Sequence, residues 1–172
     1  MIALAIITLL SSFAIPAYQD YSIKTRVAEA ISLVKPLQIA VAENAANGTW
    51  IGSGLPADYY KLNAIYFAKS TNLPKAVKSI IFDTTSGWIT ITFKGQPIDN
   101  KTLFIMPKYK ASGSSLTYVI ESDPNTGTKI PSDRISWGCR SADLATPLNL
   151  TRGTLPGKYA PQWCNEVPPD IN

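Results

Sequence analysis

The chain has no histidine and few charged residues: Asp, Glu, Lys and Arg together make up 16% of its 172 residues. Without histidine it lacks the commonest metal ligand and general base, and haem held by histidine is excluded. The formal net charge is +4, but the 16 lysines and arginines are scattered and form no basic run. The sequence also has no nucleophile–base set and no phosphate-binding loop. We therefore expect no catalytic residues, no cofactor and no metal.

Cysteine is equally scarce. The two cysteines, Cys139 and Cys164, lie 25 positions apart near the C-terminus. A zinc site would need more ligands than this chain offers, so a disulfide is the better interpretation. A disulfide implies an oxidising compartment outside the cytoplasm, and closing a loop of this size stabilises a fold by about 3–4 kcal/mol.

The opening stretch lacks charge altogether. No charged residue precedes Asp20, and residues 1–18 are almost wholly apolar, interrupted only by one threonine and two serines. As a helix these residues span about 27 Å, close to the hydrocarbon thickness of a bilayer. A soluble monomer could not bury such a helix on all sides, so we expect it in lipid or among other apolar helices. It has no basic flank and no cleavage site before Pro16, and we do not expect it to be removed as a signal peptide.

From Tyr21 the helical pattern becomes amphipathic, and Asn47-Gly48 supplies a stop signal. Side chains at helical spacing predict one stripe against a globular head: Val27, Ile31, Val34, Gln38 and Val41. Pro16 and Pro36 each remove a backbone hydrogen bond and should kink or locally open the helix.

The remaining residues, about 125, suit one domain. A connector rich in glycine, proline and aromatic residues is expected to pack against the head, with a short helix near 57–62. Alternating, β-branched segments predict strands at 77–82, 88–93, 101–110 and 116–122, and we expect 135–139 either to extend the sheet or to cap it. The fold class is α+β: a long N-terminal α-helix packed against an antiparallel β-sheet, with a C-terminal disulfide loop. The expected regions are an apolar transmembrane or filament-core helix half (1–20), an amphipathic helix half (21–47), the connecting αβ-loop (48–76), the sheet (77–138), the disulfide loop (139–164) and a tail (165–172).

Two blocks of sequence resemble a known family. The opening Met1-Ile-Ala-Leu-Ala-Ile-Ile, continued by Phe13-Ala-Ile-Pro-Ala-Tyr-Gln-Asp-Tyr21, closely resembles the N-terminal signature of type IV pilins. The ending Trp137-Gly-Cys139, followed by Lys158-Tyr-Ala-Pro-Gln-Trp-Cys164, resembles the type IVa branch of that family. The two blocks frame nearly the whole chain, whereas the middle is generic.

The resemblance implies a ladle-shaped subunit that is anchored in the inner membrane before the pilus assembly machinery polymerises it into an extracellular filament. It places the N-terminal helices in the filament core, here through apolar residues that we list together: Ile2, Leu4, Ile6, Ile7, Leu9, Leu10, Phe13 and Ile15. In the resembling filaments the helix melts between a glycine and a proline. Thr8 and Pro16 occupy these positions, so we expect extended backbone over roughly Thr8–Ile15.

Family members carry six further residues before the position of Met1, including a methylated phenylalanine and an assembly glutamate. We therefore expect an incomplete or reassigned N-terminus rather than a pilin that lacks the glutamate.

The sequence thus predicts a major pilin, a homopolymer that serves motility, adhesion or DNA uptake. The alternative is a minor pilin that acts as a binding module for DNA or a surface receptor. In the disulfide loop, Arg140, Arg152 and Lys158 outnumber Asp143, and they are the candidate cations for binding DNA or host surfaces through the filament exterior.

Overall fold

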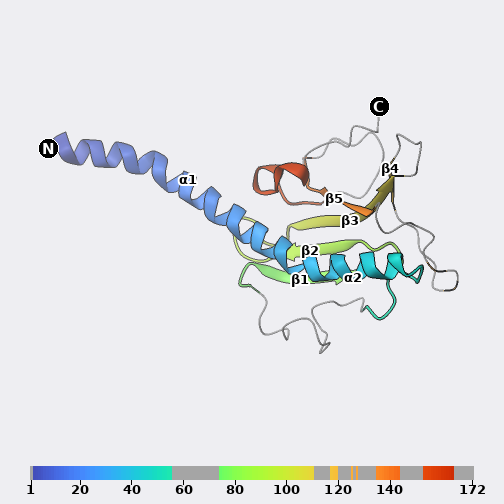
Figure 1. Ribbon diagram of the computed structural model, residues 1–172. Coiled ribbons are helices and arrows are strands. Elements are labelled where there is room, and N and C mark those ends of the chain that lie inside the picture. Colours follow the sequence, from blue (N-terminus) through green and yellow to red (C-terminus); the bar gives the residue numbers. More distant parts are fainter. Residues whose placement is uncertain are drawn as a thin grey trace.

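The computed structural model describes residues 2–55, 74–110, 117–119, 125, 127, 135–143 and 153–164. A long helix projects from a head in which the same helix continues across one face of a sheet (Figure 1). The elements that the structure describes are α1 (Ile2–Leu33), α2 (Lys35–Ala46), β1 (Val77–Phe82), β2 (Ile89–Phe93), β3 (Thr102–Lys110), β4 (Thr117–Val119), β5 (Ile135–Arg140), and the 3-10 helices η4 (Gly157–Tyr159) and η5 (Gln162–Cys164). The predicted α+β fold is confirmed. The short helix expected near 57–62 lies outside the described residues.

The helix divides at Val34 because Pro36 occupies the first turn of α2 and has no backbone N–H to donate. Val34 N–H instead bonds the Ile31 carbonyl at 3.2 Å, a tighter turn than the α-helical one. At the other end, Asn47 caps α2 and Gly48 follows with a φ of 66°, which is the glycine stop that the sequence predicts.

Pro16 lies inside α1, which is helical from Ile2 to Leu33. The extended backbone expected over Thr8–Ile15 is therefore absent from the single chain. That expectation concerns the packed filament, and it remains a prediction there. Among the described residues no helix combines the length and apolarity that a membrane crossing requires.

The sheet is antiparallel and has β3 at its centre. β1 pairs with β2, and β2 pairs with the first half of β3, from Thr102 to Ile105. β4 pairs with the second half of β3, whereas β5 pairs with β3 along Phe104–Tyr109. Because Phe104 pairs with both Thr90 and Arg140, β5 must lie on the edge of β3 opposite β2. The predicted strand 135–139 thus extends the sheet and brings Cys139 beside the centre of the head.

A continuous apolar stripe on α1 and α2 packs on this sheet. Its members recur every three or four residues and are at most 6% exposed: Ile23, Val27, Ala30, Val34, Leu37, Val41 and Ala45. They meet alternate residues of β2 and β3, among them Ile89, Ile91 and Ile105, which are fully buried. Two residues of the predicted stripe, Ile31 and Gln38, lie beside it and are only half-buried. The spacing of apolar residues predicted the helical period correctly. It was wrong in counting Ile31 and Gln38 as members of the buried stripe, because they lie at its side.

Truncating Leu37 tests this packing. Leu37 is fully buried, so Leu37→Ala should lower the free energy of unfolding by about 2–5 kcal/mol through lost apolar contacts and a residual cavity. Ile39, on the same helix, is 59% exposed, and Ile39→Ala should cost less than about 1 kcal/mol. Urea unfolding of the full chain in detergent micelles, followed by tryptophan fluorescence, measures both variants. Equal losses would contradict the assigned stripe.

Candidate functional site

The half of α1 that projects from the head exposes large apolar side chains. The described side chains that the sequence assigned to a filament core are all exposed, between 53% and 80%: Ile2, Ile6, Ile7, Leu10 and Ile15. Leu4, Leu9 and Phe13 belong to the same prediction, but their side chains, like that of Thr8, lie outside the described part. A rod with this much uncovered apolar surface is a candidate surface for binding lipid or another protein.

Where α1 enters the head, the C-terminal segment is fastened to it by polar contacts. The Tyr159 hydroxyl donates a hydrogen bond to Asp20 at 3.3 Å, and the Lys158 ammonium lies 3.6 Å from the same carboxylate oxygen. The Lys158 nitrogen is also 4.5 Å from the centroid of the Tyr159 ring. The hydrogen bond with Tyr159 and the charge of Asp20 raise the pKa of Lys158 above its usual value. We call Asp20, Lys158 and Tyr159 the clamp.

The C-terminal segment is also held against the sheet, by a disulfide and by backbone contacts. The disulfide joins Cys139 in β5 to Cys164 in η5, and Cys164 is fully buried. Gly153 lies so close to the sheet that a Cβ there would come within 2.6 Å of the carbonyl oxygens of Arg140 and Thr102. The Thr154 N–H then donates to the Thr102 carbonyl at 2.9 Å. The segment that carries the clamp is therefore fixed against β3 and β5 before it reaches α1.

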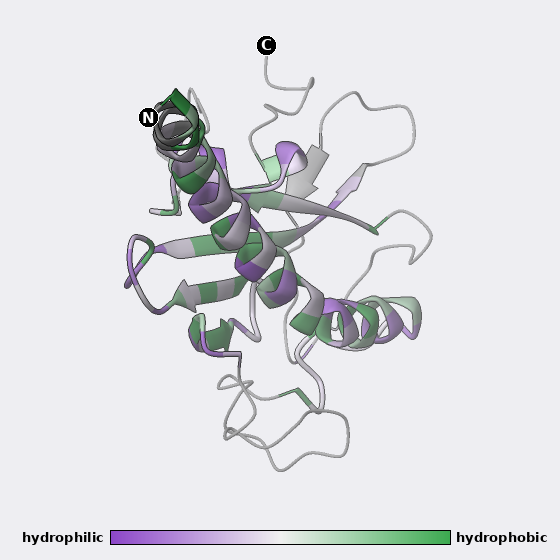
Figure 2. Ribbon diagram, turned by 90° about the vertical axis from the view of Figure 1, so that its left-hand side faces the viewer, coloured by the Kyte–Doolittle hydropathy of each residue, from purple (hydrophilic) through white to green (hydrophobic). Residues whose placement is uncertain are grey.

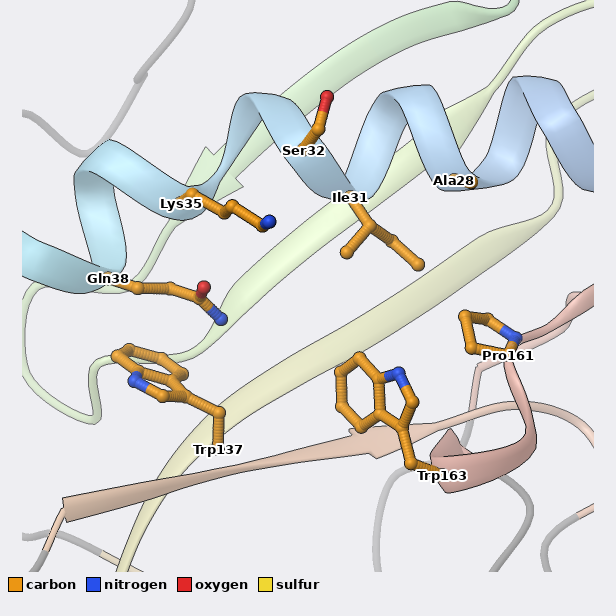
Figure 3. Close-up of a pocket in the computed structure, with 8 residues that line it drawn as sticks. All are labelled: Ala28, Ile31, Ser32, Lys35, Gln38, Trp137, Pro161 and Trp163. Carbon is orange, nitrogen blue, oxygen red and sulfur yellow. The ribbon is translucent and has the colours of Figure 1, made fainter.

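An open groove of about 470 Å³ runs between α1 and this fastened segment (Figure 3). Ile31 projects into it from the helix, with Lys35 and Gln38 farther along the same wall. The facing wall consists of Trp137 from β5 together with Pro161 and Trp163, and the Trp163 side chain is 40% exposed. The groove is thus mainly apolar and aromatic, with one amide and one cation at its edge.

Two of the three cations that the sequence assigned to surface binding are described, and their surroundings differ. Arg140 is only 8% exposed, and its guanidinium carbon lies 5.6 Å from the centroid of the Trp88 ring. Burial lowers its pKa, and its Nη1 has no hydrogen-bond partner in the described part of the chain. The assignment of Arg140 to the exposed surface is therefore corrected. It fails because Arg140 pairs with Phe104 in the sheet and shares the face of that residue.

Lys158 is exposed, but it faces Asp20 rather than solvent alone. Arg152 lies outside the described residues. Of the two cations that the structure describes, one is buried and the other is paired, so the described residues give no geometric support to the hypothesis of DNA binding by a basic patch.

Known proteins resemble this chain over most of its length. The family model for pilin, a bacterial filament protein, matches residues 24–165. The fimbrial protein EcpC of Eikenella corrodens is 32% identical over 155 residues, which cover 86% of this chain and 90% of EcpC.

The chain belongs to the pilin family.

Two further proteins are similar to the chain. The type IV major fimbrial protein FimA of Dichelobacter nodosus is 47% identical over 57 residues, but the match spans only 35% of the length of FimA and 33% of this chain. A crystal structure of a type IV pilin from Pseudomonas aeruginosa superposes with a TM-score of 0.52 over 83% of this chain and 97% of its own. At 23% identity this second likeness shows the fold of the pilin and no more.

Sequence reasoning missed the clamp and the groove. Asp20 was noted only as the first charged residue, and its partner Tyr159 is 139 positions away. The groove had a detectable signal, since Trp137 lies two residues before one cysteine and Trp163 one residue before the other. A disulfide between those cysteines must bring the two indoles into one neighbourhood.

Replacing Asp20 tests the clamp. Asp20→Asn keeps an oxygen that can accept the Tyr159 hydrogen bond but removes the negative charge, so the pKa of Lys158 should fall toward its ordinary value of 10.5. Because the pKa is raised in the folded chain, the stabilising contribution is complete below the ordinary value of 10.5 and is lost as the pH rises through the higher folded value. An NMR titration of the Lys158 side chain measures the shift. Glu43→Gln removes a negative charge from α2, away from the clamp, and should leave the Lys158 titration unchanged. If it lowered the pKa of Lys158 as much as Asp20→Asn does, the contact would be refuted.

Removing the disulfide tests how the C-terminal segment is held. The double variant Cys139→Ala with Cys164→Ala should lose about 3–4 kcal/mol of unfolding free energy, because it releases a loop closed across 25 positions. Denaturant unfolding gives the loss, with the reduced wild-type chain as the matched control. If the double variant is as stable as the oxidised protein, the loop is held by the clamp and the β3 contacts alone.

Proposed function

We propose that this pilin is the structural subunit of a type IV pilus, an extracellular helical filament built from many copies of the chain. The observation that supports the proposal most directly is the division of one helix between two environments. The half from Ile23 onward is buried against the sheet, whereas Ile2, Ile6 and Leu10 in the projecting half are more than half exposed. Sister helices of identical sequence would cover these side chains. The role is that of a structural protein, not an enzyme.

Before assembly, lipid of the inner membrane would cover the projecting half, with the head on the outer side. The composition of residues 2–18 supports this step, since all of them are uncharged and most are apolar. The pilus assembly machinery would then transfer the helix from lipid to the filament axis. Shielding about 18 mostly apolar residues from water is worth tens of kcal/mol at about 25 cal/mol per Å². The helix would therefore avoid water at every stage.

Within the filament we expect the backbone of Thr8–Ile15 to become extended. The residues Thr8, Ser11 and Ser12 are moderate helix formers, and Pro16 interrupts the hydrogen-bond ladder at the downstream end. Opening this stretch would lengthen the N-terminal segment and change the axial rise from one subunit of the filament to the next.

The proposal favours a major pilin. A minor pilin that binds DNA or a surface receptor is the alternative, but the burial of Arg140 and the pairing of Lys158 with Asp20 give it no exposed basic patch in the described loop. Motility, adhesion and DNA uptake are all functions of such fibres. Electron cryo-microscopy and mass spectrometry of fibres sheared from the cell separate the two roles. The chain dominates the fibre if it is the major subunit, and it is a trace component otherwise.

A charge in the projecting half tests the buried filament core. Ile6 is 53% exposed in the single chain, and Ile6→Lys would place an ammonium group among sister helices at a cost of several kcal/mol per subunit. Filaments should fall below detection, while the head keeps its fold and disulfide. Electron microscopy of the cell surface, with circular dichroism of the purified chain, measures both.

Ile81 on the edge strand β1 provides the matched control, because it is also an exposed isoleucine, at 44%. A lysine is well tolerated on an edge strand, so Ile81→Lys should leave filaments at the wild-type level. Normal fibres from Ile6→Lys would overturn the proposed packing.

A further inference from the structure

The groove between α1 and the C-terminal segment has the chemistry of a site for a rigid, apolar and acidic peptide. Two indoles, Trp137 and Trp163, form one wall, and Ile31 faces them from the helix (Figure 3). Lys35 is the charged residue at its edge. Grooves lined by aromatic side chains bind proline-rich segments, because a polyproline II segment is already extended and loses little entropy on docking. A lysine beside such a groove favours an acidic flank.

The chain itself contains a segment of this kind. The C-terminal tail, Asn165-Glu-Val-Pro-Pro-Asp-Ile-Asn172, places two prolines between Glu166 and Asp170 and has no lysine or arginine. The tail starts directly after Cys164 and lies outside the described residues.

We propose that the groove of one pilin binds the proline-containing tail, residues 165–172, of a neighbouring pilin in the filament. Pro168 and Pro169 pack between the indoles of Trp137 and Trp163, and Glu166 or Asp170 lies against the Lys35 ammonium. This inference rests on the proposed function, because it needs neighbouring copies held side by side.

The position of the disulfide favours a neighbour over the chain's own groove. Cys164 is fully buried and directly follows Trp163, so the tail begins at the rim of its own groove. Proline fixes its own φ and keeps Val167 out of the helical region, so the sequence favours an extended run over 167–169. An extended run leads away from the rim at which it starts, which favours the groove of a neighbour over its own. Eight extended residues reach about 25 Å.

Weak docking is sufficient in this arrangement. Subunits fixed in a filament present tail and groove to each other at a high effective concentration, so a contact that two free chains would barely form can be occupied throughout the fibre. The docking would then fix the orientation of adjacent heads.

A zero-length carbodiimide coupling on intact filaments tests the contact. The reagent joins an ammonium group to a carboxylate only when the two are in contact, forming an amide. In wild-type fibres, mass spectrometry should find Lys35 joined to Glu166 or Asp170. Lys24, an exposed lysine on α1 outside the groove, should be joined to the tail at least tenfold less often. Replacing both prolines, Pro168→Ala with Pro169→Ala, should reduce the Lys35 product at least fivefold.

A mixed filament decides between a neighbour and the chain's own tail. One chain carries Lys35→Arg, which keeps the positive charge but cannot couple, and retains the native tail. The other keeps Lys35 and carries Glu166→Gln with Asp170→Asn. A Lys35 product with Glu166 or Asp170 can then form only between two chains, at a roughly fourfold lower yield than in wild-type fibres, because one in four neighbouring pairs has the required combination.

The outcomes separate the two proposals. Product in both kinds of filament supports docking in the neighbour. Product in wild-type fibres but none in mixed ones means that the tail binds its own groove and overturns the assignment. Intact filaments without any Lys35 product overturn the groove contact and leave the pilus function standing. If the chain forms no filament, the proposed function is contradicted, and this inference is contradicted with it.

Discussion

One helix serves two different surroundings, and the rest of the structure depends on this. Its second half buries Val27, Val34 and Val41 completely against the sheet and so organises the head. Among the described residues, its first half leaves apolar side chains such as Ile2 uncovered. The hydrophobic effect acts alike on both halves, so the chain reaches its lowest free energy only when something covers the first half. Folding and assembly are in this sense driven by the same interaction on the same helix.

The clamp and the disulfide join the helix to the opposite end of the chain at the place where these surroundings change. Asp20 is the first charged residue of the helix, and its contacts with Lys158 and Tyr159 lie at the point where α1 reaches the head. The hydropathy colouring of Figure 2 shows apolar and polar residues alternating along the helix in this region. A polar contact here marks the boundary, since a carboxylate farther along the projecting half would have to enter the apolar assembly unpaired. The exposed ion pair is therefore better understood as a positional constraint than as a source of stability.

The elements with strong local signals could be predicted from the sequence. Strand β1 was found with its bounds, the helix stop at Asn47-Gly48 was correct, and the disulfide followed from two cysteines with no competing metal ligands. The failures depend on contacts between distant residues. Nothing local shows that Arg140 pairs with Phe104 and is buried against Trp88, since an arginine next to a surface loop is usually solvated. The pairing of Tyr159 with Asp20 likewise exists only after the sheet has brought the two ends of the chain together.

The groove adds a level of order that the apolar helix cannot supply. Burial of apolar surface is non-directional, so helices packed at a filament axis could slide or rotate at little cost in area. A contact between a tail and the groove would have a defined position, because Trp137, Trp163 and Lys35 occupy fixed places on β5, η5 and α2. The clamp and the disulfide transmit this position to the helix, since both fasten the same C-terminal segment. The helix would then provide most of the assembly free energy, and the head contacts would set the register between subunits.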